Sequence, residues 1–226
     1  KMSERFSDFR SDTVTQPTEA MRRSVLDAEL GDDVVACDPT VELLQRNAAQ
    51  LLGKEAALFV SSGTMGNLLA VATHCSPGDE VILGESCHIF NHEAAGTARV
   101  ASVQLHILPD GGGRLQLDRI RGAIRTPDIH HPRTRLICTE NTHNEAGGVI
   151  VPLELLRDIQ QLAREHGLLV HLDGARLFNA AVASGISARD FAATADSVTF
   201  CLSKGLCCPA GSVLCGTADF ISRARS

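Results

Sequence analysis

Short apolar segments alternate with helical patterns along most of the chain, and this alternation constrains the fold more than any other feature. Helical patterns, such as Thr40–Leu52 and Leu153–His166, lie between several segments that have the length and polarity of buried strands. Such an order predicts an α/β fold with a seven-stranded, mostly parallel sheet and helices on both faces. The seven strand-like segments span residues 56–61, 80–84, 102–108, 134–140, 168–173, 197–203 and 211–216.

The length and order of the chain predict how it is organised. A chain of 226 residues can bury one sizeable core. Residues 1–35 precede the first helical pattern and are expected to form an N-terminal arm. Residues 36–226 are expected to form a single large domain. The chain contains no internal repeat or low-complexity segment.

Charge and cysteine content exclude several classes of protein. The formal net charge of −6 argues against nucleic acid or an anionic membrane as the main partner. No apolar run reaches membrane-spanning length, and the first residues do not resemble a signal peptide. The eight cysteines follow neither a disulfide framework nor a metal-binding pattern, so we expect no metal site and a reducing, cytoplasmic location.

Lysine is rare in this sequence, and one lysine stands in an unusual place. The chain has three lysines, and Lys204 directly follows the strand-like run 197–203. A lysine at the end of a buried strand is costly unless it is neutral, paired or covalently used. Schiff-base formation with a carbonyl compound is the chemistry that needs such an amine. The alternative is a lysine that extends its stem along apolar surface and keeps its ammonium group in water.

A carboxylate lies at the end of another predicted strand. Asp173 follows the apolar run 168–172, so it falls at the carboxyl end of a parallel strand, where open α/β sheets bind ligands. A strand-end carboxylate and a strand-end lysine are the two contacts that pyridoxal phosphate requires. Asp173 alone could equally be a helix N-cap. The pair Asp173 and Lys204 favours the cofactor.

A loop of small residues lies between the first strand-like segment and a helical pattern. Ser61-Ser-Gly-Thr-Met-Gly-Asn67 could bring backbone amides and a helix N-terminus to a phosphate group. Its glycine spacing fits neither the Walker A motif nor the dinucleotide fingerprint. Many strand-to-helix turns share this composition, so the loop alone indicates little.

Six motifs in order along the chain resemble one family of pyridoxal-phosphate enzymes. The sequence from about Phe9 to Ser226 is similar to the low-specificity L-threonine aldolases, which have fold type I. The motifs are Asp8-Phe-Arg-Ser-Asp-Thr-Val-Thr15, Gly31-Asp-Asp-Val34 with Asp38-Pro-Thr40, Gly63-Thr-Met-Gly-Asn67, Glu140-Asn-Thr-His143, His171-Leu-Asp-Gly-Ala-Arg176 and Cys201-Leu-Ser-Lys-Gly205.

The resemblance implies a cofactor and a reaction. It implies pyridoxal 5′-phosphate and a lyase that cleaves L-threonine and L-allo-threonine, both β-hydroxy amino acids, to glycine and acetaldehyde. Lys204 would hold the cofactor covalently, Asp173 would pair with its ring nitrogen, and Gly63 and Thr64 would bind its phosphate. The resemblance also implies a homodimer or homotetramer, with the arm packed across a subunit boundary.

The resemblance assigns further roles near the substrate. His88 would stack on the cofactor ring near the substrate hydroxyl, and His130 would be a second histidine near that hydroxyl. Arg176 would help to bind the cofactor beside Asp173 and, with Ser11, would bind the substrate carboxylate. From the residues alone, His88 could be a hydrogen-bonded loop histidine, His130 a solvated one, and Arg176 part of a salt bridge on a helix face. His143 receives no role.

Two departures from the family bear on activity. Val35 and Ala36 stand where family members usually have a tyrosine and a glycine. Family members also continue into a small C-terminal domain with a second substrate-binding arginine, which we expect to be absent from this chain. The sequence does not tell a fragment from a natural short form.

Three functions therefore stay open at this point. The first is the threonine aldolase, which degrades threonine and forms glycine. The second is a catalytically silent or truncated relative that keeps the fold, binds the cofactor or a partner, and has no activity of its own. The third is another pyridoxal reaction, although such sites often use a tyrosine and this chain has none.

Overall fold

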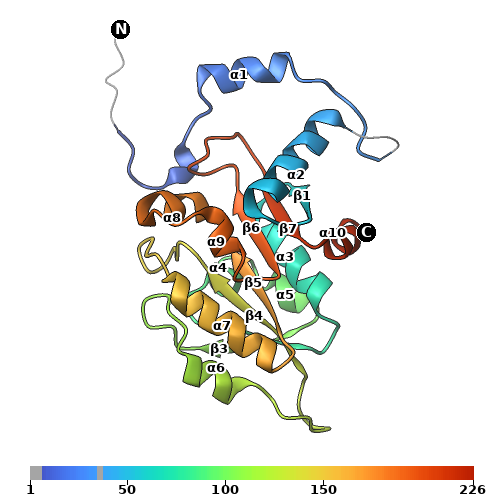
Figure 1. The fold of residues 1–226 in the computed structure, drawn as a ribbon, viewed down its shortest axis with the longest axis vertical. Coiled ribbons are helices and arrows are strands. Elements are labelled where there is room, and N and C mark those ends of the chain that lie inside the picture. Colours follow the sequence, from blue (N-terminus) through green and yellow to red (C-terminus); the bar gives the residue numbers. More distant parts are fainter. Residues whose placement is uncertain (1–6, 35–37) are drawn as a thin grey trace.

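The sheet confirms the predicted α/β fold. A computed structural model describes residues 7–34 and 38–226. Its seven strands form one sheet in the order β1-β7-β6-β5-β4-β2-β3 (Figure 1). The strands are β1 (Ala56–Val60), β2 (Glu80–Gly84), β3 (Gln104–Leu108), β4 (Thr134–Glu140), β5 (Leu169–Asp173), β6 (Ser197–Cys201) and β7 (Ser212–Gly216).

Strand direction defines two edges of the sheet. The neighbours β3, β2, β4, β5 and β6 pair in parallel, whereas β7 is antiparallel to both β6 and β1. Six strands therefore point the same way, and their carboxyl ends meet at one edge. The loops that follow Val60, Gly84, Glu140, Asp173 and Cys201 all open there. Loops that precede these strands open at the opposite, amino edge.

Helices cover both faces of the sheet, and each face has its own apolar cluster. The helices are α1 (Glu19–Leu26), α2 (Pro39–Leu52), α3 (Gly63–His74), α4 (His88–Asn91), α5 (Gly96–Arg99), α6 (Leu117–Ala123), α7 (Leu153–Glu165), α8 (Leu177–Ser184), α9 (Ala188–Ala192) and α10 (Ala218–Arg225), with a 3₁₀ turn η1 at Asp12–Val14. Helices α2, α6, α7, α8 and α9 contribute to the larger cluster. Helices α3, α4 and α10 contribute to the clusters of the other face.

Strand alternation sends neighbouring residues to opposite faces. On β5, Val170 and Leu172 belong to the larger cluster under α7, whereas His171 lies between them on the strand and bonds to α3. Gly66 on α3 allows that helix to approach closely, because a Cβ at this position would lie 2.7 Å from the Thr199 methyl group on β6. The α3 face of β5 and β6 is therefore a tight interface that includes polar groups.

The structure corrects several predicted boundaries. The strand predicted over 197–203 ends at Cys201, because the amides of Leu202 and Ser203 both donate to the carbonyl of Gly211 and turn the chain. The strand predicted over 102–108 begins at Gln104, because Ser102 has a positive φ of 55°. The helix predicted over Leu153–His166 ends one residue earlier, at Glu165.

The N-terminal arm lies partly outside the body of the domain. Its helix α1 buries none of its residues and stands beyond the sheet in Figure 1. The departures at Val35 and Ala36 lie outside the described residues. In the described ranges 7–34 and 38–226, no helix combines the length and apolarity needed to cross a bilayer.

A buried carboxylate ties strands together at the amino edge. Glu80, at the start of β2, is fully buried and accepts hydrogen bonds from Arg125, Gln104, His106 and Thr134. Burial opposes the charge of Glu80, but the bonds from Arg125 and His106 outweigh it and hold the pKa of Glu80 below its ordinary value of 4.5. The charged form of Glu80 therefore stabilises the fold.

We predict that Glu80→Gln destabilises the protein in a pH-dependent way. A carboxyl group with a lowered pKa adds stability above pH 4.5, and that stability is lost as the pH falls through the folded-state value. The variant should lose about 2 kcal/mol of unfolding free energy at pH 7, and the difference should shrink below about pH 4. Urea unfolding across this range measures it, with the exposed Glu85→Gln as control. An equal loss at every pH would contradict the prediction.

Candidate active site

The loops at the carboxyl edge bring together most of the residues that the sequence singled out. Asp173 ends β5, His88 begins α4 shortly after β2, and Gly63 begins α3 just after β1. Lys204 follows β6, and Arg176 follows β5 by three residues. Residues separated by up to about 140 positions therefore share one edge because the strands that carry them are parallel.

Asp173 is a buried carboxylate with fixed hydrogen bonds. Only 3% of its surface is exposed. Its Oδ2 accepts a hydrogen bond of 2.7 Å from the Asn67 amide on α3, and its Oδ1 accepts one of 3.0 Å from the backbone N–H of Ala175. Asp173 does not cap a helix, because α8 begins at Leu177 with Arg176 at the cap position. The N-cap alternative for Asp173 is therefore wrong.

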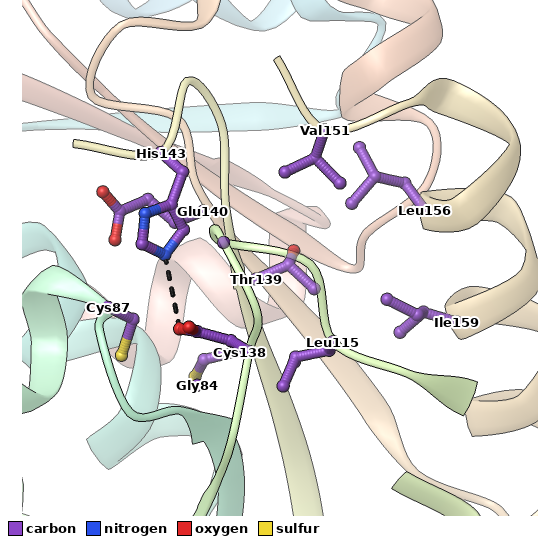
Figure 2. Close-up of a pocket in the computed structure, with 12 residues that line it drawn as sticks. Gly84, Cys87, Leu115, Cys138, Thr139, Glu140, His143, Val151, Leu156 and Ile159 are labelled. Carbon is purple, nitrogen blue, oxygen red and sulfur yellow. Dashed lines mark ion pairs between the residues drawn. The ribbon is translucent and has the colours of Figure 1, made fainter. Parts of the chain in front are cut away.

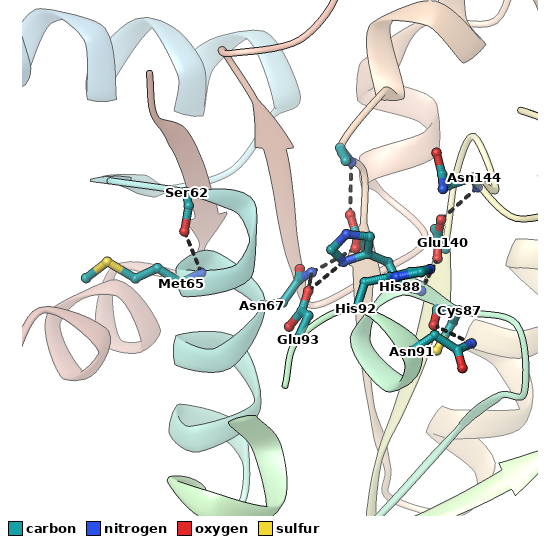
Figure 3. A network of polar contacts seen from close by, with 12 residues as sticks. Ser62, Met65, Asn67, Cys87, His88, Asn91, His92, Glu93, Glu140 and Asn144 are labelled. Atoms are coloured by element: carbon teal, nitrogen blue, oxygen red, sulfur yellow. Dashed lines mark hydrogen bonds and ion pairs between the residues drawn. The ribbon is translucent and has the colours of Figure 1, made fainter. Parts of the chain in front are cut away.

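His88 forms a histidine–carboxylate pair with a residue that the sequence did not reveal. Its Nδ1 lies 2.9 Å from Oε1 of Glu93, whose side chain is 1% exposed (Figure 3). The hydrogen bond to Glu93 raises the pKa of His88, although burial lowers it. Because Nδ1 donates to Glu93, the other ring nitrogen, Nε2, stays available. The same arrangement orients catalytic histidines elsewhere.

Glu140 holds the backbone around His88. It is the last residue of β4 and lies beside Asp173 in the sheet register. Its two oxygens accept hydrogen bonds of 2.8 Å from the backbone N–H groups of His88 and Asn144 (Figure 3). Burial and the nearby charge of Asp173 raise the pKa of Glu140. Glu140 therefore fixes the start of α4 and the loop after β4.

Three of these side chains have the elements of a metal site. Potential ligand atoms of His88, Glu93 and Asp173 lie within 4.8 Å of one another. However, the NH₂ group of Asn67 donates to both carboxylates at 2.7 Å. The two carboxylates are thus held together by an amide donor, and the cluster is organised as a hydrogen-bonded unit.

The N-terminus of α3 points its free amides at the same edge. Ser62 caps the helix by accepting from the Met65 amide, and the amides of Gly63 and Thr64 lie in the first turn, where helical partners are lacking. A Cβ on Gly63 would come within 2.9 Å of the Cys201 sulfur. Glycine therefore lets the loop lie against β6 while its N–H groups face outward, which suits an anion.

Lys204 lies in the loop after β6 and is half-buried rather than buried. This corrects the prediction of a lysine at the end of a buried strand, because the strand ends three residues earlier. The charge of Lys204 helps to lower the pKa of Asp12, and it opposes the effects of Glu93 on His88 and of burial on Cys201, which leave both of those pKa values raised. Its carbonyl accepts a hydrogen bond of 2.6 Å from Thr15 of the arm.

The arm also contacts Arg176. Asp12 binds the Arg176 guanidinium through two hydrogen bonds of 2.9 and 2.8 Å, and Asn144 binds a third nitrogen at 3.0 Å. Burial opposes the charge of Asp12, but Arg176 outweighs it, so the pKa of Asp12 is lowered. The partner of Arg176 lies 164 positions away, so the alternative of a helix-face salt bridge is wrong.

An open cleft of about 740 Å³ lies beside this ion pair. Ser11, Asp12, Asn144 and Arg176 line it together with residues of α8. The Ser11 hydroxyl accepts hydrogen bonds from the backbone and side chain of Thr13, at 3.2 and 2.9 Å, and so caps η1. The structure thus places Ser11 and Arg176 at one cleft, as the resemblance implied.

His130 does not join the site of this chain. It lies in the loop before β4, and such loops open at the amino edge of the sheet, opposite Asp173. Its side chain is exposed, and its backbone N–H donates to Asp128. The prediction that His130 lies near the substrate hydroxyl is therefore wrong for a single chain, because sequence similarity did not take account of the edge to which the loop belongs.

His143 has a structural role that the sequence did not assign. It is 2% exposed, its Nδ1 accepts from the backbone of Ala146, and its Nε2 lies 3.6 Å from Asp110 (Figure 2). The ring packs on Gly113, where a Cβ would come within 2.4 Å. His143 therefore joins the loops after β3 and β4 beside a small cavity of about 20 Å³, enough for one water.

Three residues of the site were not found from the sequence. Asp12 and Asn67 stand inside motifs that were noticed, but neither was given a role. Glu93 follows His88 by five positions, and no pattern distinguishes it from a surface glutamate. Burial of a carboxylate beside a histidine is the signal that identifies Glu93, and burial requires the fold.

Comparison with known proteins gives a consistent result. The profile of the family described as beta-eliminating lyase matches residues 8–226. A probable low-specificity L-threonine aldolase 2 of Arabidopsis thaliana is 47% identical over 222 residues, which cover 96% of this chain and 62% of the relative. The low specificity L-threonine aldolase of Escherichia coli K12 is 46% identical over 218 residues, which cover 96% and 65%.

A solved structure shares the fold. The threonine aldolase of Leishmania major superposes with a TM-score of 0.78 at 25% identity, covering 95% of this chain and 64% of the other. The chain thus spans about three fifths of the length of the curated relatives it matches.

We predict that Glu93→Gln lowers the pKa of His88, because an amide lacks the charge that stabilises the imidazolium. A raised histidine pKa adds stability below the ordinary value of 6.5, and this stability is lost as the pH rises through the raised value. The variant should therefore lose more stability at pH 5 than at pH 9.

Histidine NMR titration and thermal unfolding measure these two effects. Glu145→Gln is the control, because Glu145 pairs with His92 on the same side of the molecule at 2.9 Å. An unchanged His88 titration in Glu93→Gln would show that the pair does not set the pKa.

Proposed function

The chain belongs to the beta-eliminating lyase family, and from this premise we propose that it forms the site of an L-threonine aldolase. The reaction would split L-threonine or L-allo-threonine at the Cα–Cβ bond to give glycine and acetaldehyde, with pyridoxal 5′-phosphate as cofactor. The observation that carries the proposal is the meeting of Asp173, His88, Lys204 and the α3 N-terminus at one sheet edge.

The residues of this edge fit the cofactor. The amides of Gly63 and Thr64 offer unpaired donors for a phosphate, and the glycine is required by its contact with Cys201. Asp173 offers a buried carboxylate that suits a protonated ring nitrogen, and Lys204 offers the nearby amine for the aldehyde. In addition, Glu93 Oε2 is buried without a hydrogen-bond partner among the described residues. The donor set therefore matches a ring with a phosphate at one end.

Each side chain has a task in the proposed reaction. Pyridoxal 5′-phosphate supplies an electron sink for the charge left on Cα when the Cα–Cβ bond breaks. His88 can remove the proton of the substrate hydroxyl through Nε2, since Glu93 holds Nδ1. Glu93 stabilises the imidazolium that forms. Asp173 would face the ring nitrogen, with its orientation set by Asn67 and Ala175.

The carboxylate of the amino acid would bind at the cleft beside Arg176. The planar guanidinium suits a bidentate contact, but Asp12 already occupies two of its donors. The substrate would therefore displace Asp12 or share Arg176 through the nitrogen that binds Asn144. Ser11, at the same cleft, adds a hydroxyl donor.

Other functions receive less support. A catalytically silent relative is not favoured, because the two relatives and the solved structure described above carry the names of aldolases. We place the protein in threonine breakdown and glycine formation, and in a reducing, cytoplasmic compartment. The seven cysteines of the described residues are all free, which supports that location. Nucleic acid and membranes are not part of the proposal.

We predict that Lys204 forms the covalent link to the cofactor. Borohydride reduction in the presence of pyridoxal phosphate, followed by peptide mapping, should label Lys204, and Lys204→Arg should abolish the label. Lys54→Arg is the matched control, because Lys54 is held by the carbonyl of Ala195 at 2.5 Å. Acetaldehyde release from L-allo-threonine, measured in parallel, tests the reaction. A label on Lys54, or none at all, would overturn the proposal.

We further propose that the protein is a homodimer or homotetramer and that its partner is a second copy of the chain. Val25, Leu26 and Leu30 on the arm are 68%, 85% and 85% exposed, while Asp12 and Thr15 tie the start of the arm to the site. Apolar side chains displayed beside a functional cleft favour a subunit contact.

Sedimentation velocity at micromolar concentration should show a dimer or tetramer. The double variant Leu26→Glu/Leu30→Glu should shift it toward monomer, since two charges would be buried at the contact. Val100→Glu is the control, because Val100 is 66% exposed but does not belong to the arm. A monomeric unmodified protein, or a double variant with unchanged sedimentation, would contradict the arm contact.

A further inference from the structure

A row of polar side chains is buried between α3 and the strands β5 and β6. Its members are Asn67 and His74 on α3, His171 on β5 and Ser197 on β6, and none is more than 8% exposed. Ser197 Oγ lies 2.8 Å from both His74 Nε2 and His171 Nδ1, and His171 Nε2 lies 3.0 Å from Asn67 Oδ1. The row continues from Asn67 to Asp173 and Glu93 at 2.7 Å each.

The charges at the end of the row determine which way Asn67 points. Carboxylates only accept hydrogen bonds, so the group that Asn67 presents to Asp173 and Glu93 must be its NH₂ (Figure 3). Its carbonyl then faces His171, and His171 must carry its proton on Nε2. The N–H of one ring nitrogen thus supports the orientation in which the Asn67 amide binds two functional carboxylates.

The rest of the row fixes the tautomer of His171. Burial lowers the pKa of His171 to about 4 and that of His74 to about 3, so both are neutral at pH 7. A neutral His171 with its proton on Nε2 accepts at Nδ1, and the donor is the Ser197 hydroxyl. That hydroxyl in turn accepts from His74 Nε2. Every donor in the row therefore points toward Asp173 and Glu93.

Packing alone does not explain this row. Four buried polar side chains cost more free energy than apolar ones of similar size unless all their hydrogen bonds are satisfied. Here hydrogen bonds link all four side chains, and the row ends on the carboxylate assigned to the cofactor ring and on the carboxylate that holds His88. The same helix, α3, also carries the phosphate-binding amides at its first turn.

We propose that Asn67 is a positioning residue for both Asp173 and Glu93, and that His171, held by Ser197 and His74, fixes the orientation of its amide. The assignment of Asp173 to the cofactor ring rests on the proposed function. The hydrogen-bond order within the row does not depend on the proposed function, so either can be wrong without the other.

The first test uses the protein without cofactor. Long-range ¹H–¹⁵N NMR spectra of the imidazoles at pH 7 should show His171 and His74 as single tautomers with the proton on Nε2, and His88 protonated on Nδ1. A His171 proton on Nδ1, or exchange between both tautomers, would overturn the proposal whatever the protein binds.

The second test compares two substitutions of His171. Gln places its side-chain NH₂ near the position of Nε2, whereas Asn reaches only the position of Nδ1. His171→Gln should therefore keep the donor to Asn67, and His171→Asn should lose it and behave like Asn67→Ala. We expect the latter two to weaken pyridoxal phosphate binding on the order of tenfold, with His171→Gln within about threefold of the unmodified protein.

The ring nitrogen of ¹⁵N-labelled pyridoxal phosphate gives a second readout. Its chemical shift should move toward the unprotonated form in His171→Asn and Asn67→Ala, and stay in place in His171→Gln. Asn141→Ala is the control, because Asn141 is also fully buried but its side chain bonds only to the backbone of Val151 among the contacts described. It should lose stability without a change in ring shift.

The outcomes distinguish failure of the proposed function from failure of the positioning role. If the unmodified protein takes up no pyridoxal phosphate, the proposed function fails. The histidine tautomers then still test the hydrogen-bond order within the row. If it binds but His171→Gln and His171→Asn give equal affinities and ring shifts, the positioning role is wrong. Should His171→Asn fail to fold, the tautomers of the unmodified protein and the ring-nitrogen shift in Asn67→Ala test the positioning role instead.

Discussion

The burial of Asp173 at the end of a central strand is the constraint on which the site depends. A carboxylate with 3% exposure needs hydrogen bonds from its surroundings, and the loop after the strand supplies one, from Ala175. The other comes from Asn67 across the interface with α3. That helix must therefore lie close to β5 and β6, which Gly66 permits at Thr199. The close packing of α3 on the sheet therefore also sets the orientation of Asp173.

The amino edge of the sheet contributes to stability, whereas the carboxyl edge carries the candidate active site. At the amino edge, the Glu80 cluster joins β2, β3 and β4 through one buried charge. At the carboxyl edge, buried charges are arranged around open space instead: Glu140 fixes the start of α4, Glu93 holds His88, and Asp12 from the arm closes on Arg176. Both edges use buried carboxylates, and at the carboxyl edge Lys204 and the first amides of α3 lie beside them.

The sequence predicted the strands well because each is a short apolar run, and all seven were found within two residues of their ends. The sequence placed Asp173 at a strand end, and the structure puts Asp173, His88 and the start of α3 at the carboxyl edge of the sheet. Asn67 and Glu93 could not be found in this way, because their importance lies in burial and in contacts with residues distant in sequence. His171 was hidden inside an apolar run, although alternation along β5 turns it toward α3. Within a single chain His130 lies away from Asp173, because the loop before β4 opens at the amino edge of the sheet.

A crystal structure of the protein with pyridoxal 5′-phosphate is the most direct test of the site. It should show the ring nitrogen within hydrogen-bond distance of Asp173, the phosphate at the amides of Gly63 and Thr64, and a covalent bond from Lys204 to the aldehyde carbon. The Asn67 amide should keep its contacts with Asp173 and Glu93. A cofactor bound elsewhere, or with its ring nitrogen away from Asp173, would contradict the assignment of this edge as the active site.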